Sequence, residues 1–291
     1  MTLALTLVSA SSTALPLRPM RFFDANCDPG QRLKDDPLKF PGRPGASHEH
    51  QFLGNTTTNA YSTGESLLLA NRDGKHTTCH DPLDGSAYWL PTLYQDGKRL
   101  APGGIHVYYT ANQEVRHPLV RAFPVGFGQI AGLNTTDWRG EPQLGHEWRC
   151  VAGEDDQRTG LGSIDGPFAC STGKLRVGIH FAECWDGVNK FKLDESHVAY
   201  QSGKGCPADH PYLLPSLSLL MSWNTDTAPH RYQVSVGADG TLGTTASVHA
   251  DFFSGWEPQH LQDLVTRCLN TYPQDEQLNP RKPGFFSCNR R

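Results

Sequence analysis

The feature that most constrains this chain is a set of eight cysteines spread along its length: Cys27, Cys79, Cys150, Cys170, Cys184, Cys206, Cys268 and Cys288. None belongs to a CxxC motif, so the close pairs typical of zinc ribbons and thioredoxin-like sites are missing. An even number of scattered cysteines indicates a disulfide framework formed in an oxidising compartment. We therefore expect about four disulfides. Eight cysteines allow about 105 pairings, and the only pair we single out is Cys184 with Cys206.

The first 19 residues favour export from the cell. They form an apolar run followed by small residues, including Ser11, Thr13 and Ala14, which resemble a signal-peptidase site. The usual basic segment before such a run is missing, so the alternative is a trimmed or misassigned start. No later apolar stretch reaches the roughly 18 residues of a membrane span. We expect residues 1–19 to be a leader and residues 20–291 to be one secreted, β-rich domain.

Charge argues against one class of partner. The formal net charge is −4 and charged residues make up 19% of the chain, and we find no dense run of Lys or Arg that could neutralise a phosphate backbone. Nucleic acid is therefore not an expected partner, nor is a membrane. We expect a monomer whose partner is a polysaccharide substrate.

Short apolar runs between turn residues predict strands at 86–94, 103–111, 121–132 and 175–184. Alternation in the last run turns His180 away from the buried face. Runs at 231–238 and 246–253 flank a Gly-rich turn and predict a hairpin, whereas residues 20–60 predict a long loop. Only residues 258–270 show helical spacing. The predicted fold is an all-β sandwich or jelly roll with long loops and one C-terminal helix.

Four segments concentrate ionisable and aromatic residues, namely SHEH (47–50), DGSAYWLPTLY (84–94), CWDG with SHVAY (184–187 and 196–200) and HADFFSGW (249–256). Aromatic faces stack on sugar rings, while carboxyl and imidazole groups bind hydroxyls or move protons. This mixture predicts a carbohydrate cleft. The expected substrate-binding residues are His50, Asp84, Tyr88, Trp89, Tyr108, Trp185 and Trp256; the alternative is that the aromatic ones fill the core.

Glycoside hydrolysis needs one protonated and one ionised carboxyl group. Asp84, Asp186 and Asp251 are the candidates, although the first two precede Gly and also suit turns. Asp251 lies inside an apparent strand, where Asp is disfavoured without a partner. We expect Asp186 and Asp251 to share acid and base catalysis. His48, His197 and His249 would orient the substrate or tune these carboxyl groups.

Three alternatives stay open. One is a polysaccharide lyase, in which Tyr88, Tyr108, His197 or His249 removes a proton beside a uronate carboxylate. Another is a non-catalytic polysaccharide-binding protein. The main expectation is that the protein has no cofactor. The third alternative is a metalloenzyme, because His48 and His50 point the same way from an extended segment, and His197 or His249 could complete a divalent-metal site. We find no GxSxG, Walker, HExxH or dinucleotide motif.

The order of the segments carries a resemblance. PG, SHEH, SAYWLPTLY, VYY, AFPVGFGQIAG, LRVGIHFAECWDG, SHVAY, GCPADHP and HADFFSGW occur in this order between about Asp36 and Cys268. This series closely resembles a secreted family of fungi and actinobacteria, catalogued as the domain of unknown function numbered nineteen ninety-six and often fused to WSC carbohydrate-binding modules. The resemblance implies a polysaccharide setting by association. The motif positions are His48, His50, Tyr88, Trp89, Cys184, Trp185, Asp186, His197, His249, Asp251 and Trp256.

Overall fold

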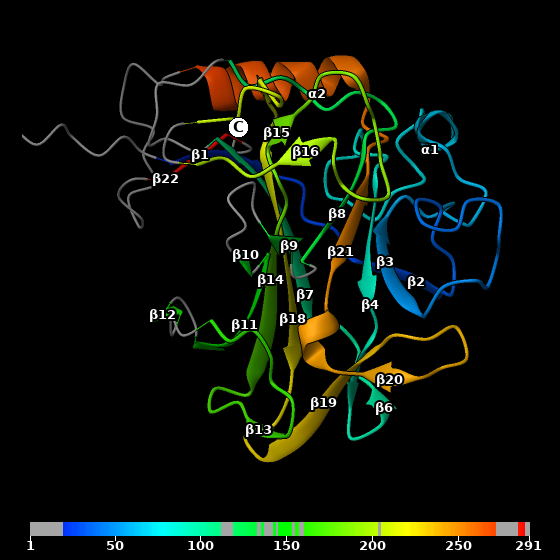
Figure 1. Ribbon diagram of the computed structural model, residues 1–291, viewed down its shortest axis with the longest axis vertical. Helices are drawn as coiled ribbons and strands as arrows, with labels where there is room; N and C mark the ends of the chain where they lie inside the picture. The colour runs from blue at the N-terminus through cyan, green and yellow to red at the C-terminus, as the bar shows by residue number, and fades with distance from the viewer. Residues whose placement is uncertain are drawn as a thin grey trace, which may run out of the picture.

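A computed structural model describes residues 20–111, 119–132, 135–136, 142–143, 145–152, 155–156, 160–202, 205–271 and 285–288. The expected leader, residues 1–19, lies outside the described residues. Strands are the main secondary structure of the described residues and pair almost entirely antiparallel, which confirms the all-β prediction. Two large sheets dominate the molecule (Figure 1).

The larger sheet has seven strands, and its alternating side chains build one wall of the core. Their order across the sheet is β12 (Asp155–Asp156), β11 (His146–Ala152), β14 (Lys174–His180), β18 (Ser216–Asn224), β7 (Gly104–Ala111), β1 (Met20–Asp24) and β22 (Phe285–Ser287). Neighbours are antiparallel except β1 with β22. In β14, Val177 and Ile179 are buried and His180 is exposed, as the alternation predicts.

The second sheet carries the candidate site. Its five strands run in the order β2 (Pro29–Leu33), β3 (His50–Gly54), β4 (Ala87–Pro91), β21 (Ala250–Phe253) and β8 (Gly128–Ala131). The two sheets pack face to face around one large core, where Tyr88 and Phe252 of this sheet join Tyr109 and Ile179 of the larger sheet. Tyr88 and Tyr109 meet directly through their hydroxyl groups.

The outer face of the five-stranded sheet is also covered. Leu38, from the loop before β3, packs with Phe52, Trp89 and Phe253 in a second apolar cluster. Strands β3, β4 and β21 are therefore buried on both faces. Residues on the outer face lie under loops, where an unpaired polar group is costly.

Smaller sheets close the ends of the molecule. One contains β13 (Pro167–Ala169), β19 (Pro229–Ser235), β5 (Leu93–Gln95) and β6 (Lys98–Arg99), with β20 (Leu242–Gly243) paired to β19. Another contains β16 (Val198–Ala199), β15 (Cys184–Trp185) and β17 (Tyr212–Leu213). A two-stranded pair joins β9 (Thr135–Thr136) to β10 (Pro142–Gln143).

Helices are few and short. The predicted C-terminal helix is present as α2 (Pro258–Leu264), which continues into a π-helical turn, η2 (Val265–Asn270), and lies across one end of the sheets (Figure 1). The sequence analysis did not predict α1 (Gly64–Ala70), which Thr63 caps, or the 3₁₀ turn η1 (Thr245–Ser247). No helix within the described residues is long and apolar enough to cross a membrane.

All eight cysteines form disulfides, as predicted: Cys27–Cys79, Cys150–Cys170, Cys184–Cys206 and Cys268–Cys288. The pairing of Cys184 with Cys206 is confirmed. This bridge closes the segment that carries β15 and β16 and covers the edge of β8.

Two local predictions were wrong. Residues 20–60 are not one long loop, because β1, β2 and β3 lie within them; backbone pairing with distant strands outweighs their weak strand pattern. The predicted hairpin of 231–238 with 246–253 does not form either. Strand β19 pairs with β5, β13 and β20, whereas β21 pairs with β4 and β8. The Gly-rich turn therefore joins β19 to β20 within one sheet, and the chain crosses to the other sheet only after β20.

Candidate functional site

The HxH motif sits where the chain enters β3. Alternation along this extended segment turns His48 and His50 to one side and Glu49 to the other. The Glu49 carboxylate accepts two hydrogen bonds of 2.8 Å from the Arg99 guanidinium. This bidentate ion pair fixes the segment, and the two imidazole rings lie with their centroids 4.1 Å apart.

The loop before β3 orients His50. Its Nδ1 atom lies 3.1 Å from the main-chain carbonyl oxygen of Asp35. A carbonyl oxygen can only accept, so Nδ1 carries the proton and Nε2 carries a lone pair. The His50 side chain is fully buried, and its Nε2 atom has no hydrogen-bond partner among the described residues.

His249, which is distant in the sequence, lies beside the rings of His48 and His50. It precedes β21, and its Nδ1 atom donates to the carbonyl oxygen of Ser247 over 3.0 Å, which again leaves Nε2 as the free lone pair. Its ring centroid lies 5.1 Å from that of His48 and 6.0 Å from that of His50. One ring nitrogen from each of the three histidines lies within 4.8 Å of the other two. We call His48, His50 and His249 the histidine cluster.

Asp251 adds a carboxyl group beside the cluster. It is fully buried in β21, between its strand partners Trp89 of β4 and Ile130 of β8. Its Oδ2 atom lies 3.8 Å from Nε2 of His249. Neither carboxyl oxygen has a hydrogen-bond partner among the described residues. No hydrogen bond from those residues therefore offsets the free energy lost when this group is removed from water.

Burial dominates the electrostatics of the site. It lowers the pKa of His48 to about 3 and that of His249 to about 4, and it holds the pKa of His50 well below its usual value. The three imidazoles are therefore neutral at ordinary pH. Burial also raises the pKa of Asp251 well above its usual value.

Three ionisable residues that the sequence analysis did not single out lie around the site. Asp36 and Glu195 lie near enough to Asp251 to raise its pKa further, and Lys39 opposes them. The Glu195 side chain accepts a hydrogen bond from the Ile130 amide, while its other oxygen is buried and unpartnered among the described residues. No motif marks these three residues; only the pairing of β8 with β21 and the loop over the sheet bring them here.

The other predicted catalytic residues lie elsewhere. Asp186 accepts hydrogen bonds from the amides of Val188 and Asn189, so its carboxylate holds a turn, which was the alternative assignment. His197 is buried and bonded through Nε2 to the carbonyl oxygen of Gly128, outside the histidine cluster. The Asp186 carboxylate is engaged in its own loop, and no described contact joins it to Asp251, so the expected sharing of acid and base work by these two residues stays a prediction.

Several expected substrate-binding residues lie in the core. The Tyr88 hydroxyl donates to Asp84 over 2.7 Å, and the Trp256 indole donates to the Tyr109 hydroxyl over 2.9 Å. All four side chains are fully or almost fully buried. The expectation that Asp84, Tyr88 and Trp256 line an open groove is corrected: they form a hydrogen-bonded network between the sheets.

The remaining expected substrate-binding residues differ from one another. Trp89 is fully buried and stacks on Phe52 beneath the covering loop, so it too is no open sugar platform. Trp185 is partly buried and donates its indole N–H to the carbonyl oxygen of Asn189. Tyr108 is partly exposed on the outer face of the seven-stranded sheet, far in the fold from the histidine cluster on the other sheet.

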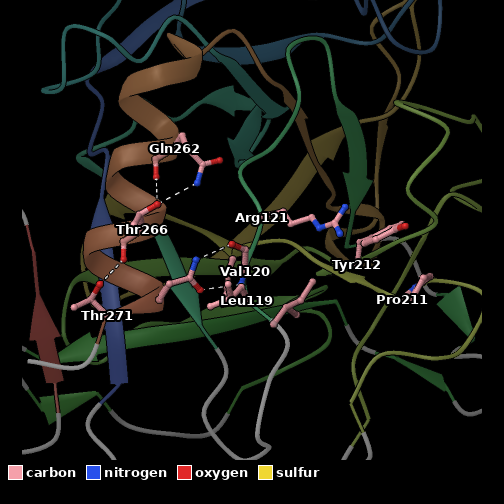
Figure 2. Close-up of a pocket in the computed structure, with 10 residues that line it drawn as sticks. Leu119, Val120, Arg121, Pro211, Tyr212, Gln262, Thr266 and Thr271 are labelled. Atoms are coloured by element: carbon pink, nitrogen blue, oxygen red, sulfur yellow. Dashed lines mark hydrogen bonds between the residues drawn. The ribbon is translucent and has the colours of Figure 1, made fainter.

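A surface pocket of about 690 Å³ lies between η2 and the segment at β17. Figure 2 shows Arg121 and Tyr212 on one side of it, with the guanidinium carbon 3.8 Å from the centre of the ring, and Gln262, Thr266 and Thr271 on the other. None of its lining residues carries a carboxyl, imidazole or thiol group. This lining can bind a ligand, but the Tyr212 phenol is its only acid–base group apart from the Arg121 cation, so the histidine cluster with Asp251 is the stronger candidate for chemistry.

A family model described as a domain of unknown function, DUF1996, matches residues 36–256. The chain belongs to this family. The histidine cluster and Asp251 lie wholly within the matched DUF1996 domain, whereas β1, α2 and η2 lie outside it. Neither curated proteins nor solved structures returned a match.

Proposed function

We propose that this DUF1996 protein is a secreted enzyme that cleaves extracellular polysaccharide, with its reaction centre at His48, His50, His249 and Asp251. One observation supports the location: unpartnered imidazole nitrogens and a carboxyl group, drawn from segments about 200 residues apart, meet at one place in the fold. Four disulfides agree with an extracellular setting. The polysaccharide rests on the family's association with sugar-binding modules.

The chemistry is hydrolysis. The histidine cluster positions the attacking water, because its ring nitrogens offer lone pairs that no described donor occupies. Asp251, on the same side of the chain as His249, assists proton transfer. His48 and His249 are the partly exposed members of the cluster and mark the side from which substrate approaches.

The test is a screen of microbial and plant polysaccharides for released reducing ends. Absorbance near 235 nm, read in parallel, separates elimination from hydrolysis. We expect Asp251→Asn to abolish product release, whereas Asp186→Asn should retain it, because an Asn side-chain oxygen can still accept the bonds that hold the 186–189 turn. Equal loss of activity in both variants, or full activity in Asp251→Asn, would contradict the proposed centre.

A second candidate function is non-catalytic binding of a polysaccharide chain by the outer face of the seven-stranded sheet. His106 and Tyr108 present rings that are only 13° from parallel, with centroids 6.0 Å apart. Beside them, the partly exposed Ser218 of β18 lies directly opposite Tyr108, and the Arg176 guanidinium is held by a bond to the buried Ser222 hydroxyl. A flat aromatic strip next to hydroxyl and guanidinium groups suits a sugar chain.

This second function is tested by affinity electrophoresis in gels that contain soluble polysaccharide. Tyr108→Ala should lose the retardation that the unchanged protein shows. The matched control is Tyr61→Ala, since Tyr61 is 67% exposed outside the two large sheets. Equal retardation of both variants would argue that the sheet face plays no part.

A further inference from the structure

We propose that His48, His50 and His249 bind one divalent transition-metal ion, for which zinc is the best fit, and that Asp251 borders its coordination shell. This inference deepens the proposed function because it concerns the same site. Metal binding can nevertheless be measured without any substrate, so the two proposals fail separately.

The first argument is the arrangement of the three ring nitrogens. They lie within 4.8 Å of one another. Three nitrogens that share one tetrahedral zinc ion, each at 2.0–2.1 Å, stand about 3.3 Å apart. Small rotations of the side chains close this difference. Since His48 is only partly buried, its ring has room to make such a rotation.

The second argument is the orientation of two of the rings by main-chain carbonyl groups. Histidine ligands of metals commonly donate their other ring N–H to a carboxylate, a carbonyl oxygen or water, which fixes the tautomer and presents the free nitrogen to the ion. His50 donates from Nδ1 to Asp35, and His249 donates from Nδ1 to Ser247. Both rings therefore present Nε2 as a ready ligand before an ion arrives.

The third argument is the unmet demand for partners. The Nε2 atoms of His48 and His50 and both carboxyl oxygens of Asp251 are buried without a hydrogen-bond partner among the described residues. A buried polar group without a partner costs about 1–3 kcal/mol. A cation at the centre of the cluster would bind several of these atoms at once, whereas no rearrangement of hydrogen bonds among imidazole lone pairs could do so.

Donor chemistry selects the class of ion. Imidazole nitrogens with one carboxylate suit zinc and neighbouring first-row divalent ions, whereas calcium and magnesium prefer shells of oxygen. Three neutral imidazoles leave the charge of the ion to the carboxyl group of Asp251 and to those of Glu195 and Asp36, which lie near enough to interact with Asp251. Three protein nitrogens on a tetrahedral ion leave a position for water, which is the arrangement of a hydrolytic centre.

The experiment uses the full-length secreted chain. Metal is removed with a chelator, the protein is titrated with ZnSO₄ by calorimetry, and a parallel sample is loaded with Co²⁺ to read the intensity of its visible bands. We expect one ion per chain, strong bands typical of four-coordinate cobalt, and a loss of affinity of about 100-fold or more in His48→Ala. His48→Ala is preferred to His50→Ala because removal of a partly exposed ring risks the fold less.

The matched control is His80→Ala. The side chain of His80 is 67% exposed, and the chain has 13 histidines that could bind metal weakly. The metal affinity of His80→Ala should equal that of the unchanged protein. Stoichiometric binding that survives in His48→Ala, or the absence of measurable binding to the unchanged protein, overturns the inference. Metal binding without polysaccharide cleavage would sink only the proposed function, and cleavage that persists after metal removal would sink only the ion's part in the reaction.

Discussion

Nε2 of His249 lies 3.8 Å from Oδ2 of Asp251, two residues further along the same chain segment. The His249 proton is on Nδ1, where it meets the Ser247 carbonyl oxygen. An imidazole lone pair therefore faces a carboxyl group, and neither supplies the other with a fixed hydrogen-bond donor. Such a pair contributes little to stability, and for this reason the proposed function places it in the reaction centre.

The first prediction concerns the stability cost of this pair. Asp251→Asn keeps the shape of the side chain, supplies N–H donors and removes a carboxyl group buried without a partner among the described residues. We expect the metal-free variant to be as stable as the unchanged protein or more stable by about 1 kcal/mol at pH 7. Urea denaturation measures this difference. A loss of more than about 2 kcal/mol would instead assign Asp251 a structural role.

The second prediction concerns pH. Burial raises the pKa of Glu183 from 4.5 to about 7. Below pH 4.5 the group is protonated in both folded and unfolded chains. Between pH 4.5 and 7 the unfolded chain loses this proton before the folded chain does, so stability falls as the pH rises, by about 1.4 kcal/mol per pH unit at most. Above pH 7 the loss is complete.

Glu183→Gln removes that dependence. The amide oxygen can still accept from the Gln201 main-chain amide, but it does not ionise. We expect the variant to gain about 3 kcal/mol relative to the unchanged protein between pH 4.5 and pH 8. Thermal or urea unfolding across that range tests the result, and parallel stability curves for the two proteins would refute it.

The third prediction distinguishes the core network from a sugar-binding site. The Tyr109 hydroxyl accepts from the Trp256 indole and contacts the Tyr88 hydroxyl. Tyr109→Phe leaves those two buried groups short of a partner, and we expect a loss of about 2–4 kcal/mol. Metal affinity and polysaccharide cleavage should stay unchanged at temperatures where the variant is folded. A stable variant with weakened sugar binding would restore the role first expected for Trp256.

The fourth prediction concerns the bridge between Cys184 and Cys206, which are 22 residues apart. Closing a loop of this length stabilises the folded state by about 3 kcal/mol, chiefly by restricting the unfolded chain. The double variant Cys184→Ser with Cys206→Ser should lose that amount in urea denaturation. The bridged segment carries Glu195 beside Asp251, so hydrogen exchange in β8 should also rise. Unchanged exchange at the Ile130 amide would show that the bridge does not support this edge.

Sequence reasoning reached the class of fold because its strongest signals are local. Alternation placed His180 outward in β14, and the spacing of Leu261, Leu264, Val265 and Cys268 predicted the helical segment. It failed where pairing is not local. Nothing in residues 231–253 shows that β19 and β21 belong to different sheets, because the same pattern suits a hairpin.

Only part of the candidate site was predicted from the sequence, because the rest depends on strand pairing that is not local. The HxH motif was recognised from its spacing, and His249 was one of two candidates to join it. The choice between His249 and His197 depends on which strand lies beside β4, and only the assembled sheet provides that information. Lys39, Asp36 and Glu195 were missed because each looks like an ordinary loop residue until the loops are folded over the sheet.

The order of β3, β4 and β21 has a consequence for how easily the centre is lost. His50 lies opposite Pro91, and Asp251 lies opposite Trp89, so both depend on the register of the strand between them. A slip of one residue in β3 would exchange His50 for Gln51 and turn the imidazole toward the interior. The centre can therefore disappear from a molecule that keeps its secondary structure and its four bridges, and such a molecule would look native by circular dichroism.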